Sequence, residues 1–237
     1  MAVAYKRVLI KISGEALAAE KKTGYDFSFV SAVCEQVKRC TALGAEVGIV
    51  VGGGNFWRGV KDGGGKIERV SADRMGMLAT AMNCLALADV MDQCGVEAKV
   101  MTAVDIQGVG ERYDTKKAIE YLESGKVVIF GCGTGLPFFS TDTAAVLRAA
   151  EIGADAILLA KNIDGVYSAD PRQDPTAVKF DEISYQDVLA RRLQVMDSTA
   201  TSLAMDNNLP VLVFALKDPA NISRVLRGEK IGTLVRG

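Results

Sequence analysis

The chain has 237 residues, of which 49% are hydrophobic and 24% are charged, and its formal net charge is -1. This length and composition are typical of a globular protein with a full core, built as one large domain or at most two small ones. The absence of a basic block or stripe argues against a nucleic-acid polymer or an anionic membrane as partner.

Apolar, β-rich runs predict a series of strands. The apolar stretch in residues 1–13 is too short and too interrupted by charge for a signal peptide or a membrane span. We therefore expect a cytoplasmic protein. The predicted strands are residues 7–12, 46–51, 97–101, 126–130, 155–160, 210–214 and 232–235.

Helical patterns lie between these strands. Val30, Val33, Cys34 and Val37 follow the i, i+3, i+4, i+7 spacing of one helix face. Further helices are predicted at residues 115–124, 141–152 and 198–208.

Two more helices carry end signals in the sequence. Residues 218–228 have an acidic cap, a proline in the first turn and a glycine after the last. Ser71 is expected to cap the other helix, after the second strand. One face of that helix holds Met75, Leu78, Ala79 and Met82.

Alternation of strands and helices predicts the fold class. The strands are continuously apolar, which favours an α/β fold, a three-layer αβα sandwich around a central, mostly parallel sheet. We expect a single domain, residues 1–237, with two functional halves that meet near residue 150. Only residues 162–175 break the rhythm, and their Asp-Gly, Pro and polar residues predict a hairpin or a long loop.

Glycine-rich segments follow three of the strands: KISGEA (11–16), VGGGNFWRG (51–59) and GCGTGLPFFSTD (131–142). One such segment is compatible with a flexible surface turn. Three of them at the carboxyl ends of parallel strands predict a shared cleft, and their backbone N–H groups would suit phosphate. The sequence matches neither the P-loop pattern nor the G-x-G-x-x-G dinucleotide pattern.

Side-chain chemistry narrows the reaction. No histidine is present, which removes Ser-His and Cys-His schemes and imidazole zinc sites. The five cysteines include no C-x-x-C pair and are interpreted as buried, reduced thiols. Lys11 ends the first strand; a lone lysine there would be a solvated edge residue, but beside three glycine loops it favours phosphoryl transfer.

A family resemblance emerges from these segments. KISGEAL, GGGNFWRG, ADRMGMLATAMN, GTGLPFFSTDTAA, IDGVYSADP and VMDSTA occur in this order along essentially the whole chain. In this they resemble the bacterial uridylate kinases of the amino acid kinase superfamily. The resemblance implies transfer of the ATP γ-phosphoryl group to UMP in pyrimidine nucleotide biosynthesis, with Mg²⁺ accompanying ATP and no metal site of the protein's own.

Carried over residue by residue, the resemblance implies three sets of site residues. The catalytic set is Lys11, Arg58, Asp142 and Asp197. The ATP-binding set is Lys11, Ile12, Ser13, Gly14, Gly54, Arg58, Lys161, Asn162, Tyr167 and Asp170. The UMP-binding set is Gly53, Asp73, Thr134, Gly135, Leu136, Pro137, Phe138, Phe139, Ser140 and Thr141.

Individual roles follow from the same resemblance. Asp142 is expected to orient Lys11 or a Mg²⁺-bound water, and Asp197 to organise Lys11 while it caps a helix. Asp73 is expected to accept the UMP ribose hydroxyls; without the resemblance it would only complement a helix dipole. Whether Lys161 or Asn162 contacts ATP stays open.

The resemblance also implies activation by GTP, inhibition by UTP and a homohexamer. The segment 18–24 is expected to correspond to a loop associated with GTP activation. Two alternatives remain at this stage. One is another kinase of the superfamily that acts on a carboxylate or a carbamate, and the other is a non-catalytic nucleotide sensor.

Overall fold

The computed structural model describes residues 3–58, 65–193 and 195–237. In this part of the chain a nine-stranded sheet has the order β4-β3-β5-β2-β1-β6-β10-β11-β9, and its neighbours are parallel except for the antiparallel pair β10–β11. The strands are β1 (Arg7–Ile12), β2 (Glu46–Val51), β3 (Ala98–Thr102), β4 (Glu111–Arg112), β5 (Val127–Gly131), β6 (Ala156–Lys161), β9 (Glu182–Ser184), β10 (Val211–Ala215) and β11 (Thr233–Arg236).

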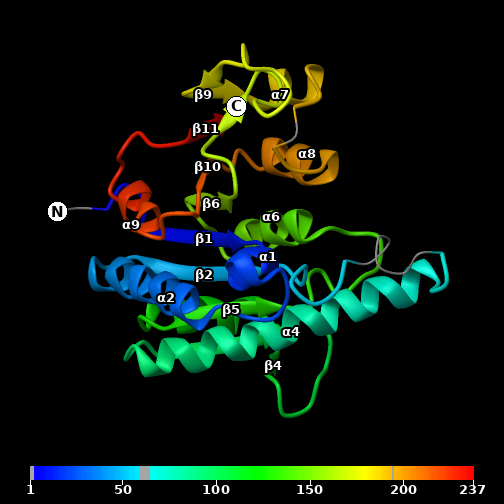
Figure 1. The fold of residues 1–237 in the computed structure, drawn as a ribbon. Helices are drawn as coiled ribbons and strands as arrows, with labels where there is room; N and C mark the ends of the chain where they lie inside the picture. The colour runs from blue at the N-terminus through cyan, green and yellow to red at the C-terminus, as the bar shows by residue number, and fades with distance from the viewer. Residues whose placement is uncertain (1–2, 59–64, 194) are drawn as a thin grey trace.

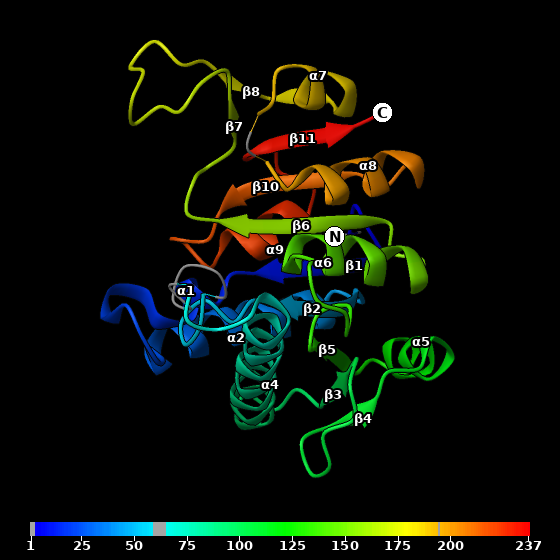
Figure 2. The same ribbon diagram turned by 90° about the vertical axis from the view of Figure 1, so that its right-hand side faces the viewer.

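Helices cover both faces of this sheet, so the predicted α/β fold with a mostly parallel sheet is confirmed (Figures 1 and 2). On one face lie α2 (Phe27–Ala42), α4 (Arg69–Gln93) and α9 (Asn221–Leu226), and on the other α5 (Thr115–Glu123), α6 (Thr141–Glu151) and α8 (Ser198–Asp206). Shorter elements are α1 (Gly14–Ala18), the 3-10 turn Ala19–Lys21 and α7 (Tyr185–Ala190).

Two apolar cores lie on opposite faces of the sheet. In β1, Val8, Ile10 and Ile12 belong to the core beneath α2, α4 and α9, while Leu9 belongs to the core beneath α5, α6 and α8. Successive side chains of a strand point to opposite faces, so a strand buried on both faces must be apolar throughout. This explains why continuous apolar runs marked the central strands.

Most predicted elements are confirmed. The first two predicted strands coincide with β1 and β2, and each of the other five begins one residue before the observed strand. The predicted face of α2, with Val33 and Val37 at its centre, is fully buried. Residues 162–175 contain β7 (Val166–Tyr167) and most of the loop after it. β7 pairs antiparallel with β8 (Lys179–Phe180), and this small pair lies at one end of the fold in Figure 2.

The predicted start of α4 is wrong. The helix begins at Arg69 after Glu68, because the Ala72 N–H already donates to the Glu68 carbonyl at 2.9 Å, and Ser71 therefore lies inside the helix. Of its predicted apolar face only Ala79 is buried. Exposed apolar side chains on α4 are Met75, Leu78, Met82 and Leu85.

The start of the C-terminal helix is also displaced from its prediction. Asp218 accepts from the Ala220 N–H at 3.0 Å and forms a turn with Pro219, and α9 begins only at Asn221. Gly228, with φ of 82°, follows the helix as predicted.

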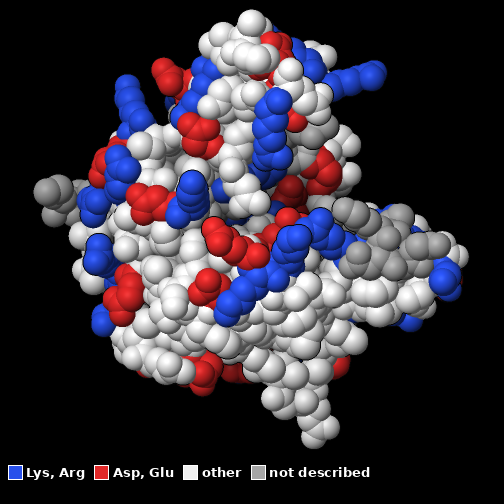
Figure 3. Space-filling model, viewed as in Figure 1, with Lys and Arg blue, Asp and Glu red and all other residues white. Residues whose placement is uncertain are grey.

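The surface seen in Figure 3 carries both basic and acidic side chains, and a short run of basic side chains crosses the middle of that face beside acidic ones. In the described residues no helix is both long and apolar enough to cross a membrane.

Candidate active site

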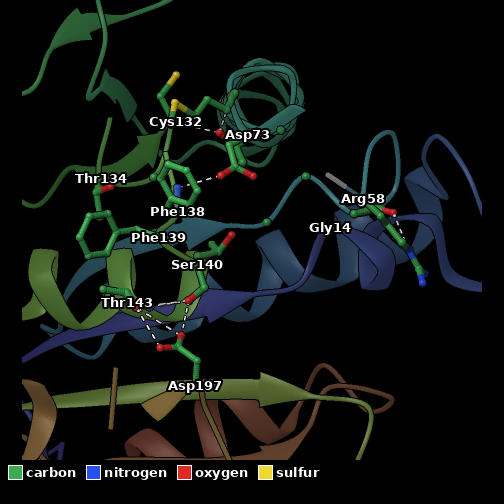
Figure 4. Close-up of a pocket in the computed structure, with 18 of the residues that line it drawn as sticks. Gly14, Arg58, Asp73, Cys132, Thr134, Phe138, Phe139, Ser140, Thr143 and Asp197 are labelled. Carbon is green, nitrogen blue, oxygen red and sulfur yellow. Dashed lines mark hydrogen bonds between the residues drawn. The ribbon is translucent and has the colours of Figure 1, made fainter. Parts of the chain in front are cut away.

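A cavity of about 620 Å³ lies at the carboxyl ends of β1, β2 and β5 (Figure 4). The three glycine-rich segments meet in its wall. Two helix N-termini also reach it: α6 begins after Ser140, whose Oγ accepts from the Thr143 N–H at 3.0 Å, and α8 begins after Asp197. Backbone N–H groups and helix dipoles at one cavity favour a bound anion.

Close packing accounts for the glycines. A Cβ on Gly14 would lie 2.5 Å from the Gly52 carbonyl oxygen, and one on Gly53 would lie 2.9 Å from the Gly76 carbonyl oxygen. Any side chain at either position would therefore force the loops apart. The segment is a tightly packed wall of the cavity, and the interpretation as a flexible surface turn is wrong for these residues.

Lys11 forms the ion pair at the base of the cavity. Its Nζ lies 2.5 Å from Oδ1 of Asp142, and only 9% of Lys11 is exposed. Asp142 Oδ1 is itself buried, so the two charges meet away from water. The pair agrees with the first of the two roles expected for Asp142. It also holds a cation at the wall of the cavity.

Asp197 has different partners. Its carboxylate accepts from the Ser140 hydroxyl, from Thr143 Oγ1 at 3.2 Å and from the Ala200 N–H at 3.0 Å, so it caps α8 and ties α8 to the start of α6. The cap agrees with the sequence-based interpretation. The direct contact with Lys11, in contrast, comes from Asp142.

Arg58 lines the same cavity as Lys11. Its guanidinium pairs with Glu15 Oε1 at 2.8 Å, and its Nε donates to the Gly54 carbonyl at 3.5 Å. Both members of the pair are partly exposed and line the cavity. The guanidinium fork can therefore exchange a carboxylate for a phosphate without crossing the protein interior.

Asp73 joins α4 to the loop after β5. It accepts the Phe138 N–H at 2.7 Å and holds the Arg69 Nε with both oxygens, at 2.9 and 2.8 Å. The Arg69 guanidinium also lies 5.3 Å from the centre of the Phe138 ring. Asp73 is the fifth residue of α4, beyond the first turn where a helix dipole acts, so it organises the loop whatever else it binds.

The loop after β5 surrounds the cavity mouth. Large apolar side chains stand in solvent there, with exposed fractions of 59% for Leu136, 64% for Phe138 and 48% for Phe139. Other predicted residues that line the cavity are Ser13, Gly14, Gly53, Gly54, Thr134, Ser140 and Thr141.

Three predicted residues stand apart from the walls found among the described residues. Ile12 is fully buried in the core. Gly135 has φ of 81° and packs against Ala103, and Pro137 lies between Leu136 and Phe138.

A second cavity, of about 660 Å³, lies on the other side of Lys11. Its walls include Lys161, Asn162, Tyr167 and Asp170, so both open candidates, Lys161 and Asn162, reach it. Lys11 also belongs to this wall, as do Ser13 and Glu15. The Lys11 side chain therefore lies at the boundary between two cavities, each large enough for a small molecule.

Lys161 is largely enclosed. Burial lowers the pKa of its ammonium from the ordinary 10.5, a trend that Asp142 opposes and Lys11 reinforces. Its Nζ donates to the Val195 carbonyl, just before α8. In the same cavity, the hydrogen bond from the Tyr167 hydroxyl to Asp164, at 2.8 Å, raises the pKa of Tyr167.

Sequence reasoning missed several wall residues. Glu15 follows Gly14 directly and pairs with Arg58. Thr143 stands three residues after Ser140, a spacing that could have marked it as a neighbour on the first turn of α6. Thr80, whose hydroxyl accepts the Cys132 N–H at 2.7 Å, carried no signal in the sequence.

Comparisons with known proteins agree with this geometry. The model of the amino acid kinase family matches residues 6–215. The structure is similar to UMP kinase from Bacillus anthracis, with 40% identity, a TM-score of 0.94, and coverage of 98% of this chain and 96% of the other. UMP kinase from Ureaplasma parvum has 36% identity, a TM-score of 0.93, and coverage of 98% and 99%. Uridylate kinase from Archaeoglobus fulgidus has 28% identity, a TM-score of 0.75, and coverage of 96% and 99%.

Proposed function

Because this chain belongs to the amino acid kinase family, among its UMP kinases, we propose that it transfers the γ-phosphoryl group of ATP to UMP, giving UDP and ADP. The observation that carries the proposal is the place of Lys11, which lies in the wall of both cavities. A reaction between two bound nucleotides needs two adjoining sites with a cation where they meet.

Most of the residues expected to bind UMP line the first cavity, and Lys161, Asn162, Tyr167 and Asp170 of the ATP-binding set line the second. Gly14, Gly54 and Arg58 of the ATP-binding set lie at the first cavity. We assign UMP to the cavity with Asp73 and Phe138 and ATP to the cavity with Asn162 and Tyr167. The N-terminal half would then hold UMP and the C-terminal half ATP, within one domain of residues 1–237. Asp73 offers a carboxylate to ribose hydroxyls, in addition to its contact with the loop.

The chemistry needs little help from acid–base groups. A phosphate monoester has a second pKa near 6, so most of the UMP phosphate is a dianion at neutral pH and can attack without a general base. One of its oxygens forms a bond to the γ-phosphorus of ATP while the bond from that phosphorus to the β–γ bridging oxygen breaks and leaves ADP. Lys11 stabilises the charge on the transferring group, and Arg58 holds phosphate oxygens at the wall of the first cavity.

Magnesium fits this site as a companion of ATP. Mg²⁺ commonly binds through one or two carboxylates together with substrate phosphates, and Asp142 offers a carboxylate beside Lys11. Asp142 would hold the ion or its water shell. The ion supplies charge neutralisation at the β- and γ-phosphates.

A coupled assay of ADP release tests the proposal. UMP, CMP, glutamate and carbamate are offered in turn with MgATP, and we expect the highest kcat/KM with UMP. Turnover with glutamate or carbamate in place of UMP would favour the alternative of another superfamily kinase. Binding of UMP and ATP without ADP release would favour the nucleotide sensor, although a sensor has no need of the Lys11–Asp142 pair.

Regulation and assembly belong to the same proposal. We propose GTP as activator and UTP as inhibitor; in support, segment 18–24 contacts the glycine loop through hydrogen bonds between Gly24 and Asn55 at 3.0 and 3.3 Å. We also propose a homohexamer in the cytoplasm, as part of pyrimidine nucleotide biosynthesis. The exposed apolar row on α4, from Met75 to Leu85, supports contact with a second copy. Light scattering of the purified chain measures the assembly.

A further inference from the structure

Two asparagines form a fully buried pair behind the glycine loop. Asn55 ends the glycine run after β2, and Asn83 lies in the middle of α4; their exposed fractions are 1% and 0%. Each carboxamide donates to the other, from Asn55 Nδ2 to Asn83 Oδ1 at 3.0 Å and from Asn83 Nδ2 to Asn55 Oδ1 at 2.8 Å. Such a polar pair in an apolar core is costly unless its remaining groups are also satisfied.

The remaining donors reach backbone oxygens of two loops. Asn83 Nδ2 also donates to the Gly52 carbonyl at 2.7 Å, and Asn55 Nδ2 donates to the Gly24 carbonyl at 3.0 Å. A carboxamide has two N–H donors, so all four in the pair are used. Asn55 Oδ1 also lies against Gly14, where a Cβ would come within 2.6 Å. The pair thus joins α4 to the glycine loop and to the loop at Gly24, and it packs against the start of α1.

The two hydrogen bonds hold the glycine loop at both of its ends. Gly52 and Asn55 are held at either end, and between them lie Gly53 and Gly54, which line the cavity assigned to UMP. Glycine peptides can rotate freely unless they are restrained. Fixing both ends leaves few orientations for the peptide N–H groups in between.

We propose that the Asn55–Asn83 pair is a positioning device that aims the Gly53 and Gly54 peptide groups at the acceptor phosphate; this rests on the proposed function. Neither carboxamide touches the substrate. Their action runs through the backbone of the glycine loop, and α4 is the rigid element that supports it.

The chain contains a reporter for the loop. Trp57 is the only tryptophan, its backbone N–H donates to the Gly53 carbonyl at 3.0 Å, and its indole donates to the Ala72 carbonyl of α4 at 2.8 Å. Movement of the glycine loop relative to α4 therefore changes the surroundings of this indole. Its emission can be read without substrate or turnover.

The test uses three variants of the pair, which are Asn83→Leu, Asn55→Leu and the double variant of both. Gln36→Leu is the control for all three. Gln36 is a matched control, since it is a buried carboxamide on α2, away from both cavities. Its Oε1 accepts a hydrogen bond from the Ser223 hydroxyl at 2.9 Å. We expect each single asparagine variant to raise the KM for UMP about ten- to a hundredfold, to change the KM for ATP less than threefold and to shift Trp57 emission, because misplacement of a binding group by about 1 Å has effects of this size.

The double variant separates positioning from stability. Replacing both partners of a buried hydrogen bond by apolar groups restores part of the stability that either single change loses. The double variant still leaves the Gly52 and Gly24 carbonyls without these donors, so the melting temperature should recover only in part while the KM for UMP stays raised. This variant serves if a single one fails to fold.

Two results would overturn the proposal: asparagine variants that lose stability with KM values and Trp57 emission unchanged, as expected of Gln36→Leu, or a double variant in which the KM for UMP returns to normal. Failure of the proposed function looks different. The unaltered protein would then not phosphorylate UMP, while Trp57 emission would still respond to Asn83→Leu.

Discussion

Substitution of Asp73 tests both the UMP assignment and the organisation of the loop after β5. Asp73 accepts from the Phe138 N–H at 2.7 Å, and we propose that it also accepts from UMP ribose hydroxyls. A hydrogen bond to a charged group contributes about 1.5–3 kcal/mol. Loss of one such bond to UMP corresponds to a rise in KM of roughly ten- to a hundredfold.

Three variants resolve the two contributions. Asp73→Ala removes both the ribose acceptor and the Phe138 contact, so we expect the larger rise in the KM for UMP, with the KM for ATP nearly unchanged. Asp73→Asn keeps one oxygen for the Phe138 N–H but loses the charge. Its KM for UMP should lie between that of the unaltered protein and that of Asp73→Ala. Asp89→Ala is the matched control, an exposed acid on the same helix whose carboxylate holds Gln93 at 2.7 Å.

Steady-state kinetics with each nucleotide varied in turn, together with melting temperatures, measure these effects. If Asp73→Ala behaves like Asp89→Ala, with both KM values unchanged, the nucleoside does not lie against α4 and the UMP assignment to this cavity is wrong. If Asp73→Asn equals the unaltered protein and only Asp73→Ala is impaired, Asp73 acts through Phe138 alone.

Further predictions concern the charges and thiols around the site. Lys11→Met should lower kcat about a hundredfold or more while circular dichroism shows a folded protein, because charge stabilisation of this kind contributes roughly 3 kcal/mol or more; near-normal kcat would remove Lys11 from the mechanism. All five cysteines are free, so activity should survive dithiothreitol and should require no zinc. Burial raises the pKa of Cys34 and Cys40 to about 12, so alkylation of these thiols at neutral pH should be slow. Inactivation by dithiothreitol, or stoichiometric zinc by elemental analysis, would contradict this. Lys161 binds its proton less tightly in the folded protein than in the unfolded one, so the free energy of unfolding should rise with pH between the lowered pKa of Lys161 and 10.5. Lys161→Met should flatten that rise, as measured by urea titrations at about pH 8 and about pH 10. An unchanged dependence on pH in this variant would count against the burial of the Lys161 charge.

The central fold could be predicted because its causes are local. A strand such as β1 must be apolar on both sides, and α2 must present one apolar face, so the sequence carries each pattern directly. Strands of two or three residues, such as β4 and β9, have too few positions for any period to show. Ser71 resembled a cap because serine favours that position, but helical hydrogen bonding already begins at Glu68.

The site was predictable by residue type and less so by partner. Lys11 and the glycines could be found because their surroundings in the sequence are distinctive. The partner of Asp73, the Phe138 N–H, lies 65 residues further along, and the Asn55–Asn83 pair spans 28 residues. Contacts between distant segments depend on how loops approach across the sheet, which no local pattern encodes.

The exposed apolar side chains around the cavity mouth have a thermal consequence. Leu136, Phe138 and Phe139 are exposed to water. A ligand that covers them removes apolar surface from water, and the heat capacity of the complex then falls below that of its separate parts. The enthalpy of UMP binding should therefore become more negative as temperature rises, more steeply than that of ATP binding at the cavity of Asn162 and Asp170. Warming would thus change the binding enthalpy of UMP more than that of ATP, because this loop releases water when UMP covers it.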